Sequence, residues 1–297
     1  MTVRRIPFMA GDAEALVAFC VANGSPFDGA VVRRLMVDLT SGPEGVFVLA
    51  DDAGPVLVAS LFDRGENAAD AAMLEILGIG AAVPRAAFAE LVIAPAVAFA
   101  RAGVRRAIHL LLHQDCARIA GAEEVLRTAG FAPGYDYLTM RRPATAAPPP
   151  PPAPLPDGWR WETVGAAHVD AAHAALHEAF RDSPSFSLSP LPLFRQLVAS
   201  GTSLFRALLD GEELAGLVQV AAAARDHELR TVARRPAWRG RGLGPRLVAE
   251  ALRLLREHGP RDVELSVEAP NERAWALYQR FGFEIETRSP VFTLTLR

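Results

Sequence analysis

The chain has 297 residues, a length that favours two domains over one. Its apolar fraction of 51% is typical of a globular protein, and a formal net charge of -3 gives no reason to expect a nucleic acid or a membrane as partner. The two cysteines, Cys20 and Cys116, allow one disulfide at most, and the first residues do not resemble a secretion signal. We therefore expect a cytoplasmic protein.

The longest apolar stretch covers residues 86–104 and is almost long enough to cross a membrane. Glu90, Pro95 and Arg101 interrupt it, and charged residues are costly in a membrane-spanning helix. We therefore predict a buried helix in this stretch.

Residues 144–157 form a proline-rich linker. Seven of the nine residues from Pro148 to Pro156 are prolines, which have no N–H group for a helix or a sheet. In a polyproline II conformation these nine residues would span about 28 Å. The alternative is a ligand for an SH3-like partner, with Arg141 and Arg142 as its flanking basic residues.

Hydrophobic periodicity predicts a mixed α/β domain after the linker. We expect four helices in it, at residues 166–180, 192–200, 243–258 and 272–281. We also expect five strands, with a hairpin turn at Asp210 and Gly211 between the first two, at residues 203–209, 214–221, 228–234, 263–267 and 291–296.

The two halves of the chain share short segments in the same order, about 150 residues apart. Residues 127–131 resemble residues 279–283, and residues 102–106 resemble residues 258–262. A duplicated domain is the economical explanation. The predicted fold class is therefore α/β (α+β), with tandem domains at residues 1–143 and 158–297, each a mixed central sheet flanked by helices.

Residues 239–244, which we call the phosphate turn, have the sequence Arg-Gly-Arg-Gly-Leu-Gly and connect a predicted strand to a predicted helix. Backbone N–H groups and the helix dipole can face an anion at such a place. Glycines allow the backbone to approach phosphate oxygens closely. The turn lacks the Lys and Ser/Thr of a P-loop, and its glycine spacing is not that of a dinucleotide-binding fold.

Residues 232–244 resemble the acetyl-CoA motif of the GCN5-related N-acetyltransferase (GNAT) family. The family pattern R/Q-x-x-G-x-G/A is met within the phosphate turn, and Pro236 and Trp238 supply the preceding proline and aromatic residue. Arg234 stands where the family usually has an aliphatic residue. A second family segment, N-x-x-A-x-x-x-Y-x-x-x-G-F, is matched by residues 271–283. The resemblance implies these cofactor-binding residues: Val232, Ala233, Arg234, Arg239, Gly240, Arg241, Gly242, Leu243, Gly244 and Asn271.

By the same resemblance, strands 228–234 and 263–267 should diverge and leave backbone groups for the pantetheine arm, with Asn271 beside it. Arginines near the turn, at positions 235, 241, 246 and 273, suit the phosphates of the cofactor. The loop at residues 183–190 should edge the acceptor site.

The resemblance implies transfer of an acetyl group from acetyl-CoA to a primary amine of a small-molecule or peptide acceptor, without a metal. A CoA-binding sensor without turnover and a transferase for a longer acyl group are the alternatives. Both a monomer and a homodimer remain open.

Tyr278 is the candidate general acid, because a phenol stays protonated at neutral pH and can protonate a departing thiolate. A core position for Tyr278 is the alternative. Glu228 is the candidate general base, as in relatives where a glutamate on this strand acts through water. His227 is the alternate base, and a solvated strand entrance would explain both residues. His173 and His177 are predicted to be surface residues and not metal ligands.

The first half lacks these features. Its counterpart of the phosphate turn falls in residues 78–86, where Pro84 has no N–H group and alanines and a valine replace glycines. Leu126 stands in the place of Tyr278 and cannot donate a proton. We therefore predict that residues 1–143 form a degenerate, non-catalytic copy and that residues 158–297 form the catalytic domain.

Overall fold

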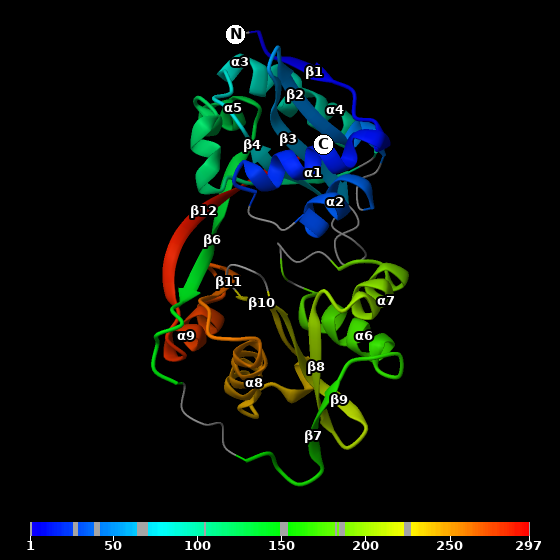
Figure 1. Cartoon of the computed structure of the whole chain (residues 1–297), viewed down its shortest axis with the longest axis vertical. Coiled ribbons are helices and arrows are strands. Elements are labelled where there is room, and N and C mark those ends of the chain that lie inside the picture. Colours follow the sequence, from blue (N-terminus) through cyan, green and yellow to red (C-terminus); the bar gives the residue numbers. More distant parts are fainter. Residues whose placement is uncertain are drawn as a thin grey trace. The chain divides into compact units, whose positions relative to one another are not determined.

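The computed structural model of the chain describes residues 2–25, 29–38, 42–63, 71–103, 105–148, 154–181, 183, 188–222 and 227–296. These residues form two compact units (Figure 1). Unit 1 comprises the described parts of residues 1–136 together with residues 289–296, and unit 2 lies within residues 137–288.

Unit 1 contains a buried helical segment at the place predicted from the apolar stretch. Residues 85–102 are helical throughout, with a π-helical segment (Ala89–Ile93) between α3 and α4, and Phe88, Val92 and Ala96 are buried. None of the described helices is long and apolar enough to cross a membrane. The principal elements begun in this half are β1 (Arg4–Ile6), α1 (Ala13–Ala22), α2 (Gly29–Val37), β2 (Val46–Asp51), β3 (Gly54–Asp63), β4 (Ala71–Ile79), α3 (Arg85–Phe88), α4 (Ala94–Ala102), β5 (Ala107–Leu111), α5 (Ala122–Thr128) and β6 (Ala132–Arg142).

The second half repeats the order of elements of the first, which confirms the internal repeat. The predicted strands and helices are present, but the first strand of this half was missed and the last begins at Glu284, not at residue 291. The elements are β7 (Trp159–Thr163), α6 (Val169–Ala179), α7 (Leu191–Ser200), β8 (Leu204–Asp210), β9 (Glu213–Ala222), β10 (His227–Arg234), α8 (Leu243–Glu257), β11 (Val263–Glu268), α9 (Glu272–Arg280) and β12 (Glu284–Thr295).

The two halves of the chain exchange their last strands. The end of β12 joins the sheet of unit 1, and the end of β6 joins the sheet of unit 2. In unit 1 the strand order is β1-β2-β3-β4-β5 followed by the end of β12, whose residues 291–295 pair with β5. In unit 2 the order is β7-β8-β9-β10-β11 followed by the end of β6, whose residues 137–142 pair with β11. The unit boundaries therefore differ from the expected division at residues 143 and 158, because the long strands β6 and β12 each continue from one unit into the other.

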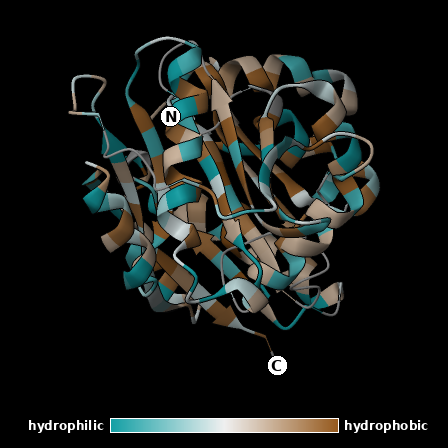
Figure 2. Cartoon of the chain, turned by 90° about the horizontal axis from the view of Figure 1, so that it is seen from below, coloured by the Kyte–Doolittle hydropathy of each residue, from teal (hydrophilic) through white to brown (hydrophobic). Residues whose placement is uncertain are grey.

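Apolar clusters cover both faces of the sheet in unit 2. Leu247, Leu252 and Val267 belong to the cluster under α8 and α9, whereas Leu176 and Phe194 belong to the cluster under α6 and α7. Figure 1 shows these helix pairs on opposite sides of the sheet. Figure 2 shows mainly hydrophobic strands and helices that carry both hydrophilic and hydrophobic stretches, as expected for amphipathic helices over a buried sheet.

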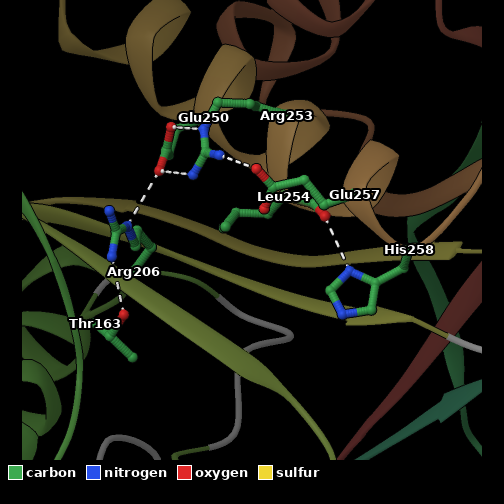
Figure 3. Close-up of polar contacts among 7 residues, drawn as sticks. All are labelled: Thr163, Arg206, Glu250, Arg253, Leu254, Glu257 and His258. Carbon is green, nitrogen blue, oxygen red and sulfur yellow. Dashed lines mark hydrogen bonds and ion pairs between the residues drawn. The ribbon is translucent and has the colours of Figure 1, made fainter.

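A network of ion pairs and hydrogen bonds connects Glu250 and Arg253 on α8 to Arg206 on β8 (Figure 3). The Glu250 side chain is 7% exposed, and it accepts hydrogen bonds from Arg206 Nε at 3.1 Å and from Arg253 Nε at 2.8 Å. Arg206 also donates to Thr163 Oγ1 at 2.9 Å. Burial acts to raise the pKa of Glu250, but Arg253 and Arg206 together outweigh this and hold the pKa below the ordinary glutamate value. The network therefore stabilises the helix that follows the phosphate turn.

Glu250→Gln is expected to lower the free energy of unfolding by about 2 kcal/mol at pH 7, because a buried hydrogen-bonded charge is lost and its arginine partners remain. A lowered pKa contributes stability above the unfolded value of about 4.3, and this contribution is lost as the pH falls through the folded value. Denaturant titrations of variant and wild type should therefore converge in acid. Glu257→Gln, at the exposed end of the same helix, is the control and should cost about 0.5 kcal/mol or less. A Glu250→Gln deficit that persists below pH 3 would contradict the assignment.

Candidate functional site

The centre of the candidate site is a gap between two parallel strands of unit 2. β10 and β11 pair at only two positions, His227 with Val263 and Glu228 with Glu264. Beyond them β10 continues beside β9 to Arg234, and β11 continues beside β6 to Glu268. The predicted divergence of the two strands is thus confirmed. A divergence of this kind presents backbone N–H and C=O groups that need other partners.

The phosphate turn follows β10 and a short 3-10 helix (Pro236–Trp238) and ends at the start of α8. Gly240 has φ 80° and Gly242 has φ 69°, and this left-handed region is unfavourable for residues with a Cβ. Gly242 is the N-cap of α8, so the N–H groups at the helix start have no carbonyl partner within the helix. Pro245, also in the first turn, has no N–H group to satisfy. The turn thus presents a helix N-terminus suited to an anion.

Gly244 has a different role. A Cβ at this position would lie 3.0 Å from Leu277 Cδ2, so glycine allows α8 to pack closely against α9. Leu243 is buried and anchors the start of α8 in the core. Asn271 is exposed and caps α9, because its side chain accepts a hydrogen bond from the N–H group of Ala274 at 3.3 Å. Asn271 and Gly244 therefore help to position α9, Asn271 by capping its first turn and Gly244 by allowing close contact with Leu277.

Three arginines have no carboxylate partner among the described residues: Arg234 at the end of β10, Arg239 in the phosphate turn and Arg273 in the first turn of α9. Burial lowers the pKa of Arg234, and the charges of Arg239 and Arg273 lower it further, which places the three guanidinium groups near one another. Arg234 Nε is buried and has no hydrogen-bond partner among the described residues. Such a group of mutually repelling cations is suited to bind a polyanion.

The other arginines near the turn have partners within the fold. Arg235 donates two hydrogen bonds to Glu178, at 2.8 and 3.0 Å, and its guanidinium lies 5.2 Å from the Trp238 ring. Arg246 donates to the carbonyl of Pro154 in the linker at 2.8 Å. Arg241 is 58% exposed and lies 3.7 Å from Asp210, a weak contact that leaves it accessible to a ligand.

Tyr278 lies on α9, half-buried against Phe283, with the two ring centroids 5.9 Å apart. Burial raises the pKa of its hydroxyl well above the ordinary tyrosine value, and the nearby Tyr137 raises it further. The hydroxyl is therefore protonated at neutral pH, as a general acid must be. Tyr137 comes from β6, so sequence reasoning confined to residues 158–297 missed it.

The two candidate bases differ in their surroundings. Arg230 Nε donates to Glu228 Oε2 at 2.7 Å, so a cation already neutralises this carboxylate. His227 is 1% exposed, and its Nε2 lies 3.0 Å from the carbonyl of Gly259. The prediction of a solvated strand entrance is therefore wrong for His227, which the pairing of β10 with β11 buries.

Glu268 is a further acidic residue at the gap. It is the last residue of β11, and it accepts a hydrogen bond from Ser183 Oγ at 2.7 Å. Val267 belongs to the cluster under α8 and α9, so the alternation of a strand places Glu268 on the opposite face, where Ser183 lies. Ser183 begins the predicted acceptor loop, of which residues 184–187 lie outside the described residues. The alternation of apolar and acidic residues in β11 was the available signal.

The prediction of a surface position is wrong for His173. It is buried on α6, where its Nε2 lies 2.8 Å from the carbonyl of Ser189 and its ring packs against Phe194. Within the described part of the chain, no group of three or more His, Cys, Asp or Glu residues is arranged to hold a metal ion.

Comparison with known proteins agrees with this geometry. The sequence pattern of the acetyltransferase (GNAT) family matches residues 170–283. A mycothiol acetyltransferase of Brachybacterium faecium is 32% identical over 191 residues, which cover 60% of this chain and 57% of that protein. The match thus spans little more than half the length of this relative.

Two solved structures resemble the whole chain in fold. A GCN5-related N-acetyltransferase of Sphaerobacter thermophilus has a TM-score of 0.67 and 20% identity, with 99% of this chain and 96% of that chain covered. A tandem GNAT protein from the clavulanic acid biosynthesis pathway has a TM-score of 0.70 and 16% identity, with 99% and 98% covered. The gap, the phosphate turn and Tyr278 thus lie within the residues that match the GNAT family, and the whole chain has the fold of the tandem GNAT protein.

Proposed function

We propose that unit 2 transfers an acetyl group from acetyl-CoA to a primary amine. The observation that carries this proposal is the divergence of β10 and β11 beside the glycine-rich N-terminus of α8, with Arg234, Arg239 and Arg273 in the same part of unit 2. These cations and the N–H groups of the phosphate turn would hold the phosphates of the cofactor, and the unpaired strand edges would hold its pantetheine arm.

Tyr278 is the general acid in the proposed reaction. The neutral amine attacks the thioester carbonyl, a C–N bond forms, and the C–S bond breaks as the sulfur takes a proton from Tyr278. The ammonium group that results must lose a proton. Glu228 is the proposed base, acting through water. Glu268 offers a second carboxylate on the face of the gap where Ser183 lies, and it would orient the amine.

We propose a small-molecule acceptor. The relative from Brachybacterium faecium is named a mycothiol acetyltransferase, and the residues of this chain that match the GNAT family include both sides of the gap. The carboxylates of Glu228 and Glu268 would accept hydrogen bonds from the neutral amine as it approaches from the side of α6 and α7.

We further propose that unit 1 has no catalytic role, because its own side chains occupy the corresponding strand edge. β4 and β5 pair only up to Leu74 and Leu110. Beyond this point His113 Nε2 lies 3.0 Å from the carbonyl of Ile76, and Arg118 donates to the carbonyl of Ile79. The N–H and C=O groups of Val83 bond to the backbone of residues 118–120. These contacts support a single cofactor site in the chain.

An assay of thiol release by the full chain, with acetyl-CoA and a panel of small primary amines, tests this function. We expect at least one amine to release free CoA faster than the hydrolysis measured without amine, together with the acetylated amine in the products. Calorimetric binding of acetyl-CoA without release by any amine would favour the sensor. Faster CoA release from a longer acyl-CoA than from acetyl-CoA would favour a transferase for a longer acyl group. Absence of CoA binding would contradict the proposed acetyltransferase and both of these alternatives.

A further inference from the structure

A cavity of about 250 Å³ lies in unit 2, at the end of the sheet where β10 and β11 begin. We call it the basic cavity. It is lined by residues from the segment after β6, the last turns of α8, the following turn and the first residues of the two strands, among them Arg142, His227, Leu255, Arg256, Arg261 and Val263. The phosphate turn follows the other end of β10, which is about 23 Å away along a strand of this length. The two sites are therefore separate.

Arg142 is an unusual lining residue because it is buried, with 7% exposure, and has no carboxylate partner among the described residues. Its Nε donates to the carbonyl of Phe281 at 2.8 Å, and its Nη2 donates to the carbonyls of Ala146 and Ala147 at 3.4 and 2.7 Å. Burial lowers its pKa, and the charge of Arg256 lowers it further. A buried cation is costly without a counter-charge, and here a second cation is added.

The described lining of the basic cavity contains no aspartate or glutamate. The neighbouring Asp262 is engaged elsewhere, since it accepts hydrogen bonds from Arg141 Nη1 at 3.3 Å and from the N–H group of Ala144 at 2.8 Å. The linker sequence contributes no acidic residue between positions 143 and 156. The counter-charge for Arg142 and Arg256 is therefore absent from the lining and from the linker sequence.

His227 specifies the chemistry of the missing ligand. Its Nε2 lies 3.0 Å from the carbonyl of Gly259, so the neutral ring donates through Nε2–H and keeps a lone pair on Nδ1. Nδ1 is buried and has no partner among the described residues. The cavity thus requires negative oxygens for two arginines and a hydrogen-bond donor for an imidazole. A hydrogen phosphate group has both, whereas sulfate has no proton to donate at neutral pH.

We propose that the basic cavity binds a phosphate group, with Arg142 and Arg256 contacting its oxygens and His227 Nδ1 accepting its hydroxyl proton. The size of the cavity fits free phosphate or a small phosphate monoester and excludes a nucleotide cofactor.

Calorimetric titration of the full chain with inorganic phosphate, at constant ionic strength, tests the proposal. It is performed with and without CoA, because a phosphate bound at the phosphate turn would be displaced by CoA and one in the basic cavity would not. Arg256→Ala is the test variant, since Arg256 lies in the last turn of α8 and its loss leaves the contacts of Arg142 intact. Arg280→Ala, in the last turn of α9, is the matched control.

We expect saturable phosphate binding that CoA leaves unchanged, and an increase in Kd of about tenfold or more for Arg256→Ala but not for Arg280→Ala. Sulfate should bind at least about tenfold more weakly than phosphate, because it cannot donate to His227. Tighter binding of glycerol 3-phosphate would identify an ester as the ligand, and weaker binding would identify free phosphate. Absence of saturable binding, its loss with CoA, or equal affinity of Arg256→Ala would overturn the proposal. If CoA itself does not bind, the proposed function is wrong. The comparison of Arg256→Ala with Arg280→Ala then still tests whether phosphate binds in the basic cavity.

Discussion

Tyr278→Phe is expected to lower kcat by about 10²- to 10⁴-fold while leaving the Kd of acetyl-CoA within about twofold of wild type. The variant keeps the ring that packs against Phe283 and removes only the proton that the departing thiolate needs. Steady-state thiol release gives kcat, and calorimetry gives the Kd. Because burial raises the pKa of Tyr278, the wild-type rate should not fall with rising pH until well above the ordinary tyrosine value of about 10.

Tyr135→Phe is the matched control for this variant. Tyr135 lies on the part of β6 that belongs to unit 1, and its hydroxyl is buried. Its removal should leave kcat unchanged. Turnover of Tyr278→Phe at the wild-type rate would remove Tyr278 from the mechanism and leave it a core residue.

A fragment of residues 158–297 is expected neither to unfold cooperatively nor to bind CoA. It contains every proposed catalytic residue, but it lacks Tyr137–Arg142, which pair with the whole length of β11. Without them β11 becomes an exposed strand edge, and apolar residues such as Leu138 and Met140 are missing from the core under α8 and α9.

A fragment of residues 137–288 provides the comparison, because it contains all the described residues of unit 2. It should unfold in one cooperative transition and bind CoA with about the affinity of the full chain. Circular dichroism during denaturant titration and calorimetry would compare the two fragments. If the fragment of residues 158–297 equals the longer one in both measurements, β6 is dispensable for the site.

Local patterns in the sequence predicted most elements of unit 2. α8 starts at Leu243, as predicted. Gly242 immediately before it has a left-handed conformation, which ends the glycine-rich turn and begins the helix. β7 was missed because it has only five residues, too few for a clear alternation of apolar and polar side chains. The partner of β11 was also beyond prediction, since pairing between distant strands leaves no local signal.

The divergence of β10 and β11 and the glycines of the phosphate turn were predicted from the sequence, whereas the partners of the side chains around them were not. The sequence did not distinguish among the four arginines predicted to suit the phosphates of the cofactor, at positions 235, 241, 246 and 273. In the structure Arg235 is held by Glu178, whereas Arg273 shares its surroundings with Arg234 and Arg239. Glu268 was missed because no motif marks it, and its relation to Ser183 arises only when the loop after α6 folds onto the sheet.

Because β5 pairs with β12, the sheet of unit 1 can be completed only after the last residues of the chain have been synthesised. β5 ends at Leu111, and its partner residues in β12 begin at Val291, about 180 residues later in the chain. At a ribosomal rate of about 5–20 residues per second, the edge of β5 waits roughly 10–40 s for its neighbour. During that interval the sheet of the first half is open to pairing with other nascent chains, so protection of this edge by a chaperone would govern the yield of folded protein.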